Sequence, residues 1–210
     1  MMVGLVLCGG RSSRFGSEKA VAPVGDGVMM DRPLAALRPI CLSLAVSARP
    51  ASGAEAHAND LGIACLQDNP KSAEGPLAGI WKGLEWAAEC GATWLAVAPC
   101  DAITVTSRHY DGLQRALVGD AVAVVATSRS GLEPLVSIWP VSSGLAAVVG
   151  ALADGGHPSI RSVLDCLGAV RVPLDDYDGA NVNFRRDLRQ ASPVTRDDPS
   201  ICHEAQWRGC

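Results

Sequence analysis

Two adjacent glycines and three cations follow the first apolar run of the chain. The apolar run covers residues 3–7, and Gly9 and Gly10 come after it. Adjacent glycines let the backbone turn sharply and present its N–H groups to a ligand with no side chain in the way. The cations bind phosphate oxygens well, because arginine holds them bidentately and lysine adds a mobile charge. They are Arg11, Arg14 and Lys19. This arrangement predicts a nucleoside triphosphate site.

The spacing within this segment differs from that of the two commonest phosphate-binding loops. The P-loop requires Gly-x-x-x-x-Gly-Lys-Ser/Thr, whereas Ser17 and Glu18 separate Gly16 from Lys19. The dinucleotide fingerprint Gly-x-Gly-x-x-Gly does not fit adjacent glycines either. An ordinary glycine turn followed by a solvated charged stretch is the alternative. We favour the phosphate site because the glycines directly follow a predicted buried strand.

A carboxylate follows another predicted strand. Residues 94–98 form an apolar run, and Asp101 comes shortly after it. Mg²⁺ prefers hard oxygen ligands and usually takes one or two protein carboxylates together with substrate phosphates. Asp101 is therefore a candidate magnesium ligand at the sheet edge that also carries the glycine pair. The alternative role is that of a loop or cap residue before the turn at residues 104–107.

A third candidate segment lies between a predicted strand and a predicted helix. Asp68 follows the strand expected over residues 64–66, and Gly75-Pro76-Leu77-Ala78-Gly79 opens the helix expected over residues 77–90. Pro76 suits a first helical turn, and Gly75 and Gly79 leave room for a flat ligand. An ordinary loop and helix start is the alternative.

Two asparagines near the C-terminal end form a fourth candidate. Asn181 and Asn183 alternate, so they project from the same side if the segment is extended. They could hydrogen-bond a ligand or cap the helix expected over residues 185–188, and the residues taken alone favour capping.

The elements that must position these residues alternate between strands and helices. Apolar runs predict parallel strands, and residues 133–139 are expected to return antiparallel. Helical spacing of apolar residues predicts helices between the strands. Such alternation indicates an α/β fold: a single Rossmann-like, doubly wound, mostly parallel sheet with helices on both faces. The expected parallel strands cover residues 3–7, 42–47, 64–66, 94–98, 121–126 and 169–172. Ligands of such sheets bind at the carboxyl ends of strands.

Size and charge limit the classes of protein. The 210 residues suit one domain, expected over residues 1–191, with residues 192–210 as a poorly packed tail. The net charge of −4 argues against a nucleic-acid partner. Membrane insertion is not expected, because no apolar run approaches the roughly 20 residues of a membrane span. The first residues do not resemble a signal peptide, so a cytoplasmic location is expected. The eight cysteines include no Cys-x-x-Cys pair and are expected to be mostly reduced core thiols.

Together these segments resemble the molybdenum cofactor guanylyltransferases, a family of nucleotidyltransferases. The resemblance covers residues 3–188. It implies transfer of GMP from Mg·GTP to the terminal phosphate of molybdopterin-bound molybdenum, with release of pyrophosphate. It also implies a partner that accepts the product, either a molybdoenzyme or a cofactor-delivery protein. The matching motifs are the loop at residues 7–19, Gly75-Pro76-Leu77-Ala78-Gly79, Pro99-Cys100-Asp101, Glu133-Pro134-Leu135 and Asn181-Val182-Asn183.

The resemblance implies a role for each candidate residue. Lys19, Arg14 and Asp101 act on the reacting phosphates, with Asp101 also anchoring Mg²⁺. Asn181 and Asn183 face the acceptor. No general base is needed, because the attacking phosphate is already ionised. The implied nucleotide-binding residues are Leu7, Cys8, Gly9, Gly10, Arg11, Lys19, Asp68, Gly75, Pro76, Leu77, Gly79 and Asp101.

Three departures from the family pattern keep alternatives open. Glu18 replaces a common aspartate, Ala48 replaces a common asparagine, and Phe184-Arg185-Arg186 replaces Thr-Pro-Glu. A cytidylyltransferase or a sugar-phosphate nucleotidyltransferase of the same fold is one alternative, although the glycine pair and the 75–79 segment favour GTP. A non-catalytic nucleotide-binding module is the other, and Lys19 with Asp101 argues against it.

Overall fold

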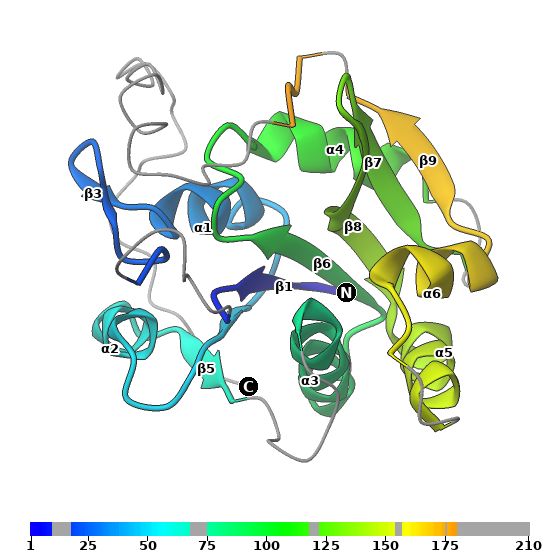
Figure 1. Cartoon of the computed structure of the whole chain (residues 1–210), viewed down its shortest axis with the longest axis horizontal. Helices are drawn as coiled ribbons and strands as arrows, with labels where there is room; N and C mark the ends of the chain where they lie inside the picture. The colour runs from blue at the N-terminus through cyan, green and yellow to red at the C-terminus, as the bar shows by residue number, and fades with distance from the viewer. Residues whose placement is uncertain (10–17, 68–74, 118–121, 154–156, 175, 180–210) are drawn as a thin grey trace.

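Seven strands form the central sheet of the computed structural model, which describes residues 1–9, 18–67, 75–117, 122–153, 157–174 and 176–179. The strand order is β5-β4-β1-β6-β8-β7-β9 (Figure 1). The strands are β1 (Met2–Leu7), β4 (Leu44–Ser47), β5 (Ala64–Leu66), β6 (Trp94–Pro99), β7 (Val124–Ser128), β8 (Gly131–Pro140) and β9 (Val170–Pro173). A separate hairpin consists of β2 (Pro23–Val24) and β3 (Gly27–Val28).

The strands in the middle of the sheet are parallel and buried on both faces. All six residues of β1 are buried, as are all four of β4, and near-continuous apolar strands of this kind are typical of parallel sheets. β1 pairs in parallel with β4 and β6, and Leu7 lies beside both Ser47 and Pro99. The carboxyl ends of these three strands therefore meet at one edge.

The predicted antiparallel return is confirmed. β8 runs antiparallel to β6 and β7, so its first residues lie at the edge where β6 ends. β7 and β9 are parallel to each other. The mostly parallel α/β sheet expected from the alternation of strands and helices is therefore correct.

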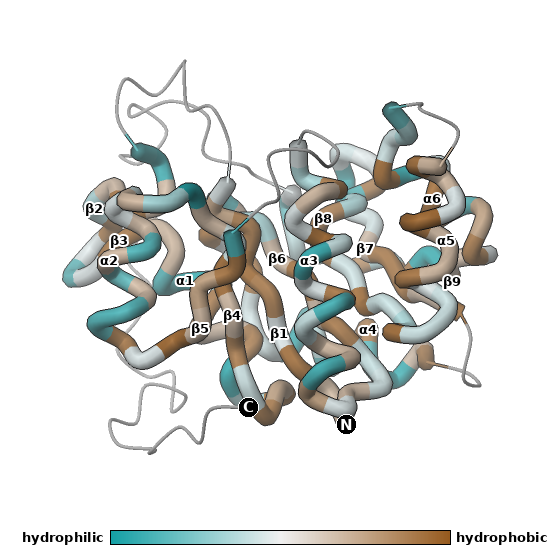
Figure 2. Tube along the Cα trace, turned by 90° about the horizontal axis from the view of Figure 1, so that it is seen from below, coloured by the Kyte–Doolittle hydropathy of each residue, from teal (hydrophilic) through white to brown (hydrophobic). Residues whose placement is uncertain are grey.

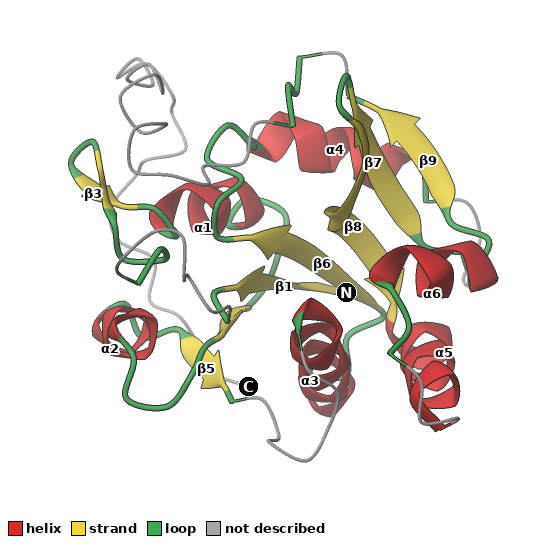
Figure 3. Cartoon of the chain, viewed as in Figure 1, coloured by secondary structure: helices red, strands yellow, loops and turns green. Residues whose placement is uncertain are grey.

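Helices cover both faces of the sheet, as Figures 1 and 3 show. On one face α1 (Asp31–Leu37), α2 (Gly53–Asp60) and α4 (Ser107–Arg115) contribute to one hydrophobic cluster. On the other face α3 (Pro76–Glu89), α5 (Val141–Ala153) and α6 (Ile160–Cys166) form a second. The hydropathy colouring in Figure 2 is strongly apolar along β4 and β1 between them. The sheet thus separates two cores.

The periodicity of apolar residues does not predict α2 or the β2–β3 hairpin. The buried residues of α2 are only Ala54 and Ala58, so the helix has no stripe of large apolar side chains. The hairpin strands are two residues each, below the length at which alternation can be recognised. Within the described residues, no helix is long and apolar enough to cross a membrane.

Candidate active site

The candidate site lies at the edge where β1, β4 and β6 end. The backbone N–H of Cys8 donates to the carbonyl of Ser47 at 2.8 Å, and the N–H of Cys100 donates to the carbonyl of Leu7 at 3.1 Å. These bonds continue the strand pairing one residue beyond the sheet, so Cys8 and Gly9 leave β1 next to the segment that leads to Asp101. Hydrogen bonding to Cys100 and burial raise the pKa of Cys8 well above its ordinary value. The thiol therefore stays protonated.

Lys19 and Asp101 form an ion pair across this edge. The ammonium nitrogen Nζ of Lys19 lies 2.5 Å from Oδ2 of Asp101, although 82 positions separate them in the chain. The side chains are 15% and 19% exposed, so the pair is largely shielded from water while one side stays reachable. The loop lysine and the carboxylate after β6, both expected at this edge, are therefore in contact, while their roles toward phosphate and metal stay predictions. Opposite charges this close, away from bulk solvent, suit a ligand that carries both phosphates and a cation.

A tight turn holds the backbone of Lys19. The carbonyl of Lys19 accepts from the N–H of Ala22 at 3.1 Å. The carbonyl of Ala20 accepts from the N–H of Met30 at 2.9 Å, and that of Ala22 accepts from Met29 at 2.9 Å. Met29 and Met30 are fully buried. Lys19 therefore extends from a segment that is tied to the start of α1.

The N-terminus of α3 forms another side of the edge. Gly75 caps the helix with φ +90°, a conformation that favours glycine, and Pro76 occupies the first turn as predicted. Among the described residues, a Cβ on Gly75 would meet no atom within 4 Å. Leu77 is buried in the core beneath.

Gly79 has a different reason for being glycine. A Cβ at this position would lie 2.7 Å from Cδ2 of Leu7 and 2.8 Å from Oγ of Ser47. Because Gly79 has no side chain, α3 can approach β1 and β4 closely. Packing alone therefore explains a glycine at this position, without a ligand. Leu7 is only 6% exposed and contributes to the same contact. Nucleotide contacts of Leu7, Leu77 and Gly79 stay predictions.

Several predicted residues lie outside the described part of the chain. These are Gly10, Arg11, Arg14, Asp68, Asn181 and Asn183. The segment that precedes the two asparagines is described, and it is anchored at both ends. His109 on α4 lies 3.1 Å from Asp176, and the hydroxyl of Thr104 donates to Asp178 at 3.0 Å. Between them the ring of Tyr177 is fully buried. The chain thus reaches residue 179 over the same edge as Asp101.

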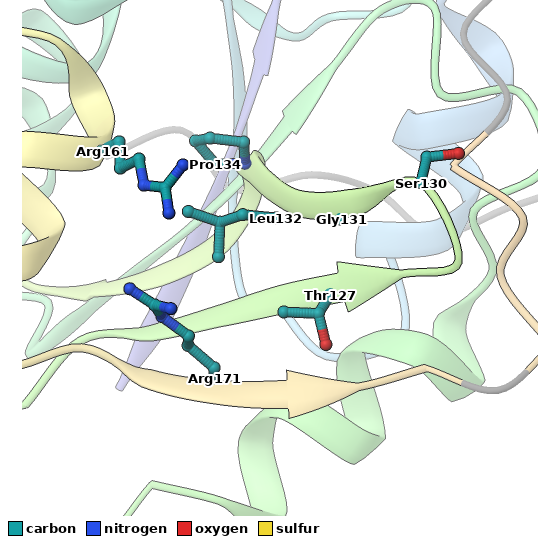
Figure 4. A pocket seen from close by; sticks show the side chains of 7 residues that line it. All are labelled: Thr127, Ser130, Gly131, Leu132, Pro134, Arg161 and Arg171. Carbon is teal, nitrogen blue, oxygen red and sulfur yellow. The ribbon is translucent and has the colours of Figure 1, made fainter.

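A cavity of about 450 Å³ opens farther along this edge, between the β7–β8 hairpin, β9 and α6. Figure 4 shows the guanidinium groups of Arg161, from α6, and Arg171, from β9, facing it beside Leu132 and Pro134. Arg171 pairs with Asp165 at 3.0 Å. The residues that line the cavity suit an anionic group with a flat apolar part, because arginine both forks onto oxygens and stacks. Spacing in the sequence could not reveal it, since α6, β8 and β9 meet only through the fold.

The carboxylate of Asp101 fits a magnesium ion bound together with phosphates. Its oxygens are of the hard type that Mg²⁺ takes, and partial exposure leaves one side reachable. Among the described residues there is no group of three or more His, Cys, Asp or Glu that could hold a metal.

Comparisons with known proteins agree with the geometry of this edge. The family model of the MobA-like NTP transferase domain matches residues 4–171. A molybdenum cofactor guanylyltransferase of Cereibacter sphaeroides is 31% identical over 199 residues, covering 94% of this chain and 98% of the relative. One from Mesorhizobium japonicum is 30% identical and covers 91% of this chain and 94% of its own.

Solved structures share the fold. Molybdopterin-guanine dinucleotide biosynthesis protein A from Archaeoglobus fulgidus superposes with a TM-score of 0.68 at 22% identity, covering 90% of this chain and 96% of its own. A 4-diphosphocytidyl-2C-methyl-D-erythritol synthase from Anaerococcus prevotii gives 0.72 at 10% identity, covering 90% and 93%. The family match spans the edge with Lys19 and Asp101 and both helical layers. The chain therefore belongs to the MobA-like NTP transferase family and is a nucleotidyltransferase.

Proposed function

We propose that this protein transfers GMP from Mg·GTP to the phosphate of a molybdopterin-type acceptor and releases pyrophosphate. The observation that carries the proposal is the Lys19–Asp101 pair at the carboxyl ends of the central strands. The identity of its relatives supports the choice of substrates. The catalytic unit is proposed to span residues 1–191, with residues 192–210 as a tail.

In this proposal the reaction needs positioning and charge neutralisation more than proton transfer. The attacking phosphate is already ionised, and negative charge grows on the departing pyrophosphate. Lys19 can stabilise that charge, because its ammonium group is held at the edge and is largely shielded from water. Arg11 and Arg14, with the N–H groups of Gly9 and Gly10, hold the remaining phosphates. Mg²⁺ bound at Asp101 would neutralise triphosphate charge.

The two substrates are proposed to bind at opposite ends of this edge. The donor base and ribose are proposed to lie beside Asp68, Gly75 and Pro76, where a Cβ on Gly75 would meet no atom of the described residues within 4 Å. The acceptor is proposed to approach from the side of β8, with Asn181 and Asn183 as its contacts. The arginine-lined cavity lies on that side. Because β8 lies between β6 and β7, two strand spacings, or about 10 Å, separate β6 from β7.

A pyrophosphate-release assay tests this function. Each of the four nucleoside triphosphates is supplied with Mg²⁺, with and without molybdopterin carrying molybdenum. Release that needs GTP and the acceptor is the expected result. Preference for CTP would assign the protein to cytidylyl transfer, and turnover only with a sugar phosphate would change the acceptor. Binding of a triphosphate without release under any condition would identify a non-catalytic nucleotide-binding module.

A further inference from the structure

The carboxylate of Glu18 binds the first turn of α2. Its Oε2 accepts from the backbone N–H of Gly53 at 2.7 Å, and its Oε1 accepts from the N–H of Ala54 at 2.9 Å. The first N–H groups of a helix have no partner within the helix, and the helix dipole favours a negative charge there. Glu18 therefore connects the residue before Lys19 to the start of an eight-residue helix.

The same helix end is also capped locally. The hydroxyl of Ser52 accepts from the N–H of Glu55 at 3.2 Å. Ser52 satisfies one backbone donor within its own segment, whereas Glu18 reaches the helix from 35 residues away. The two side chains thus stabilise one helix terminus, but only one of them joins it to the phosphate-binding segment.

Gly53 allows this contact. A Cβ there would lie 3.0 Å from Cγ2 of Val21 and 3.1 Å from Oε2 of Glu18. Residues 18–21 therefore pack directly against the start of α2. On its other side the carbonyl of Ala20 in this segment accepts from the N–H of Met30. Lys19 lies between two fixed elements, and Glu18 supplies the connection to one of them.

We propose that Glu18 is a positioning residue, which fixes the backbone at Lys19 to α2 and so holds the ammonium group at Asp101. The consequence for turnover rests on the proposed function, whereas the placement of Lys19 does not. The contact with two N–H groups requires a side chain with both the length and the negative charge of glutamate. A glutamine keeps the length, but its amide nitrogen would face one of the two backbone donors.

Two variants of the full chain test this role. Glu18→Gln weakens the connection, and Ser52→Ala removes a cap from the same helix end without touching residues 18–19. The folded proteins are acetylated with limiting reagent, and the labelling of Lys19 is measured by peptide mass spectrometry relative to Lys82 on α3. Lys82 is 44% exposed and serves as the internal reference.

Lys19 labelling should rise several-fold in Glu18→Gln and stay at the wild-type value in Ser52→Ala. In the transfer assay kcat should fall about ten- to a hundredfold in Glu18→Gln, the usual cost of a small misplacement of a reacting group. The KM for GTP should change less than kcat. Ser52→Ala should keep the wild-type kcat.

Equal labelling of Lys19 in wild type and Glu18→Gln would overturn the proposal, as would the same increase in Ser52→Ala. Increased labelling with an unchanged kcat would refute the effect on turnover. The labelling needs neither nucleotide nor acceptor. A wild-type protein that transfers no nucleotide, but shows the labelling difference, would therefore refute the proposed function and leave the role of Glu18 in place.

Discussion

Replacing Gly79 by alanine tests whether the close approach of α3 to the sheet is a packing requirement. The new methyl group would lie 2.7 Å from Leu7 Cδ2 and 2.8 Å from Ser47 Oγ, and both neighbours are buried. Overpacking of this kind costs about 1–3 kcal/mol. Alanine also favours a helix by about 1 kcal/mol relative to glycine. The net change is therefore a loss of up to about 2 kcal/mol of unfolding free energy.

Gly150→Ala is the matched control. Gly150 lies within α5, and a Cβ there would meet no atom within 4 Å. This variant should keep the helix gain of about 1 kcal/mol without the packing cost. The two variants should therefore differ by about 1–3 kcal/mol.

Urea unfolding measures both variants, with tryptophan fluorescence as the signal. Trp139 is fully buried and should report the loss of the core beneath α3 and α5. Gly79→Ala should have the lower midpoint, with an unchanged slope. If Gly79→Ala is as stable as Gly150→Ala, the contact with Leu7 and Ser47 is not tight and the packing explanation of Gly79 is refuted.

Three further predictions concern the ion pair and a buried thiol. Asp101→Ala should lower Mg²⁺-dependent turnover by about a hundredfold or more, or about 3 kcal/mol in the transition state, and normal turnover would remove Asp101 from the metal site. Lys19→Ala should lower kcat for GTP and CTP by the same factor in steady-state assays, and a changed base preference would contradict its role at the phosphates. Burial raises the pKa of Cys41 from 9.0 to about 12, so the unfolded chain loses this proton first as pH rises. The stability from this group is complete below pH 9 and is lost between pH 9 and about 12, so the urea midpoint should fall over that range, less steeply in Cys41→Ala than in wild type.

The position of Asp101 at the edge where β1 ends could be predicted from the sequence because it depends on a general property of parallel sheets. Strands β1 and β6 are recognisable as apolar runs, and their carboxyl ends share one edge. Asp101 comes two residues after the end of β6, so its position in the chain is enough to place it at this edge. The antiparallel course of β8 was predictable for a similar reason, since its apolar run follows β7 after a very short connection.

The role of Glu18 could not be predicted in this way. Its partners are the backbone N–H groups of Gly53 and Ala54. Because nearly every residue has a backbone N–H group, the residue types do not reveal such a contact. The helix that presents them buries only small alanines, so its periodicity is too weak to reveal it. From sequence, Glu18 therefore looks like a mild replacement of aspartate. The arginine-lined cavity was missed for the related reason that Arg161 and Arg171 belong to different elements.

The reversed direction of β8 has a consequence for how such an enzyme can change its specificity. A parallel strand presents its end to the active edge, and the chain must then cross back through a helix. β8 instead presents its beginning, and residues 129–130 alone connect it to β7 at that edge. The length and composition of this hairpin tip can therefore vary without moving any helix or any residue of the Lys19–Asp101 pair. The half of the edge that we propose for the acceptor can in this sense change independently, while the half proposed for the donor is fixed by the central strands.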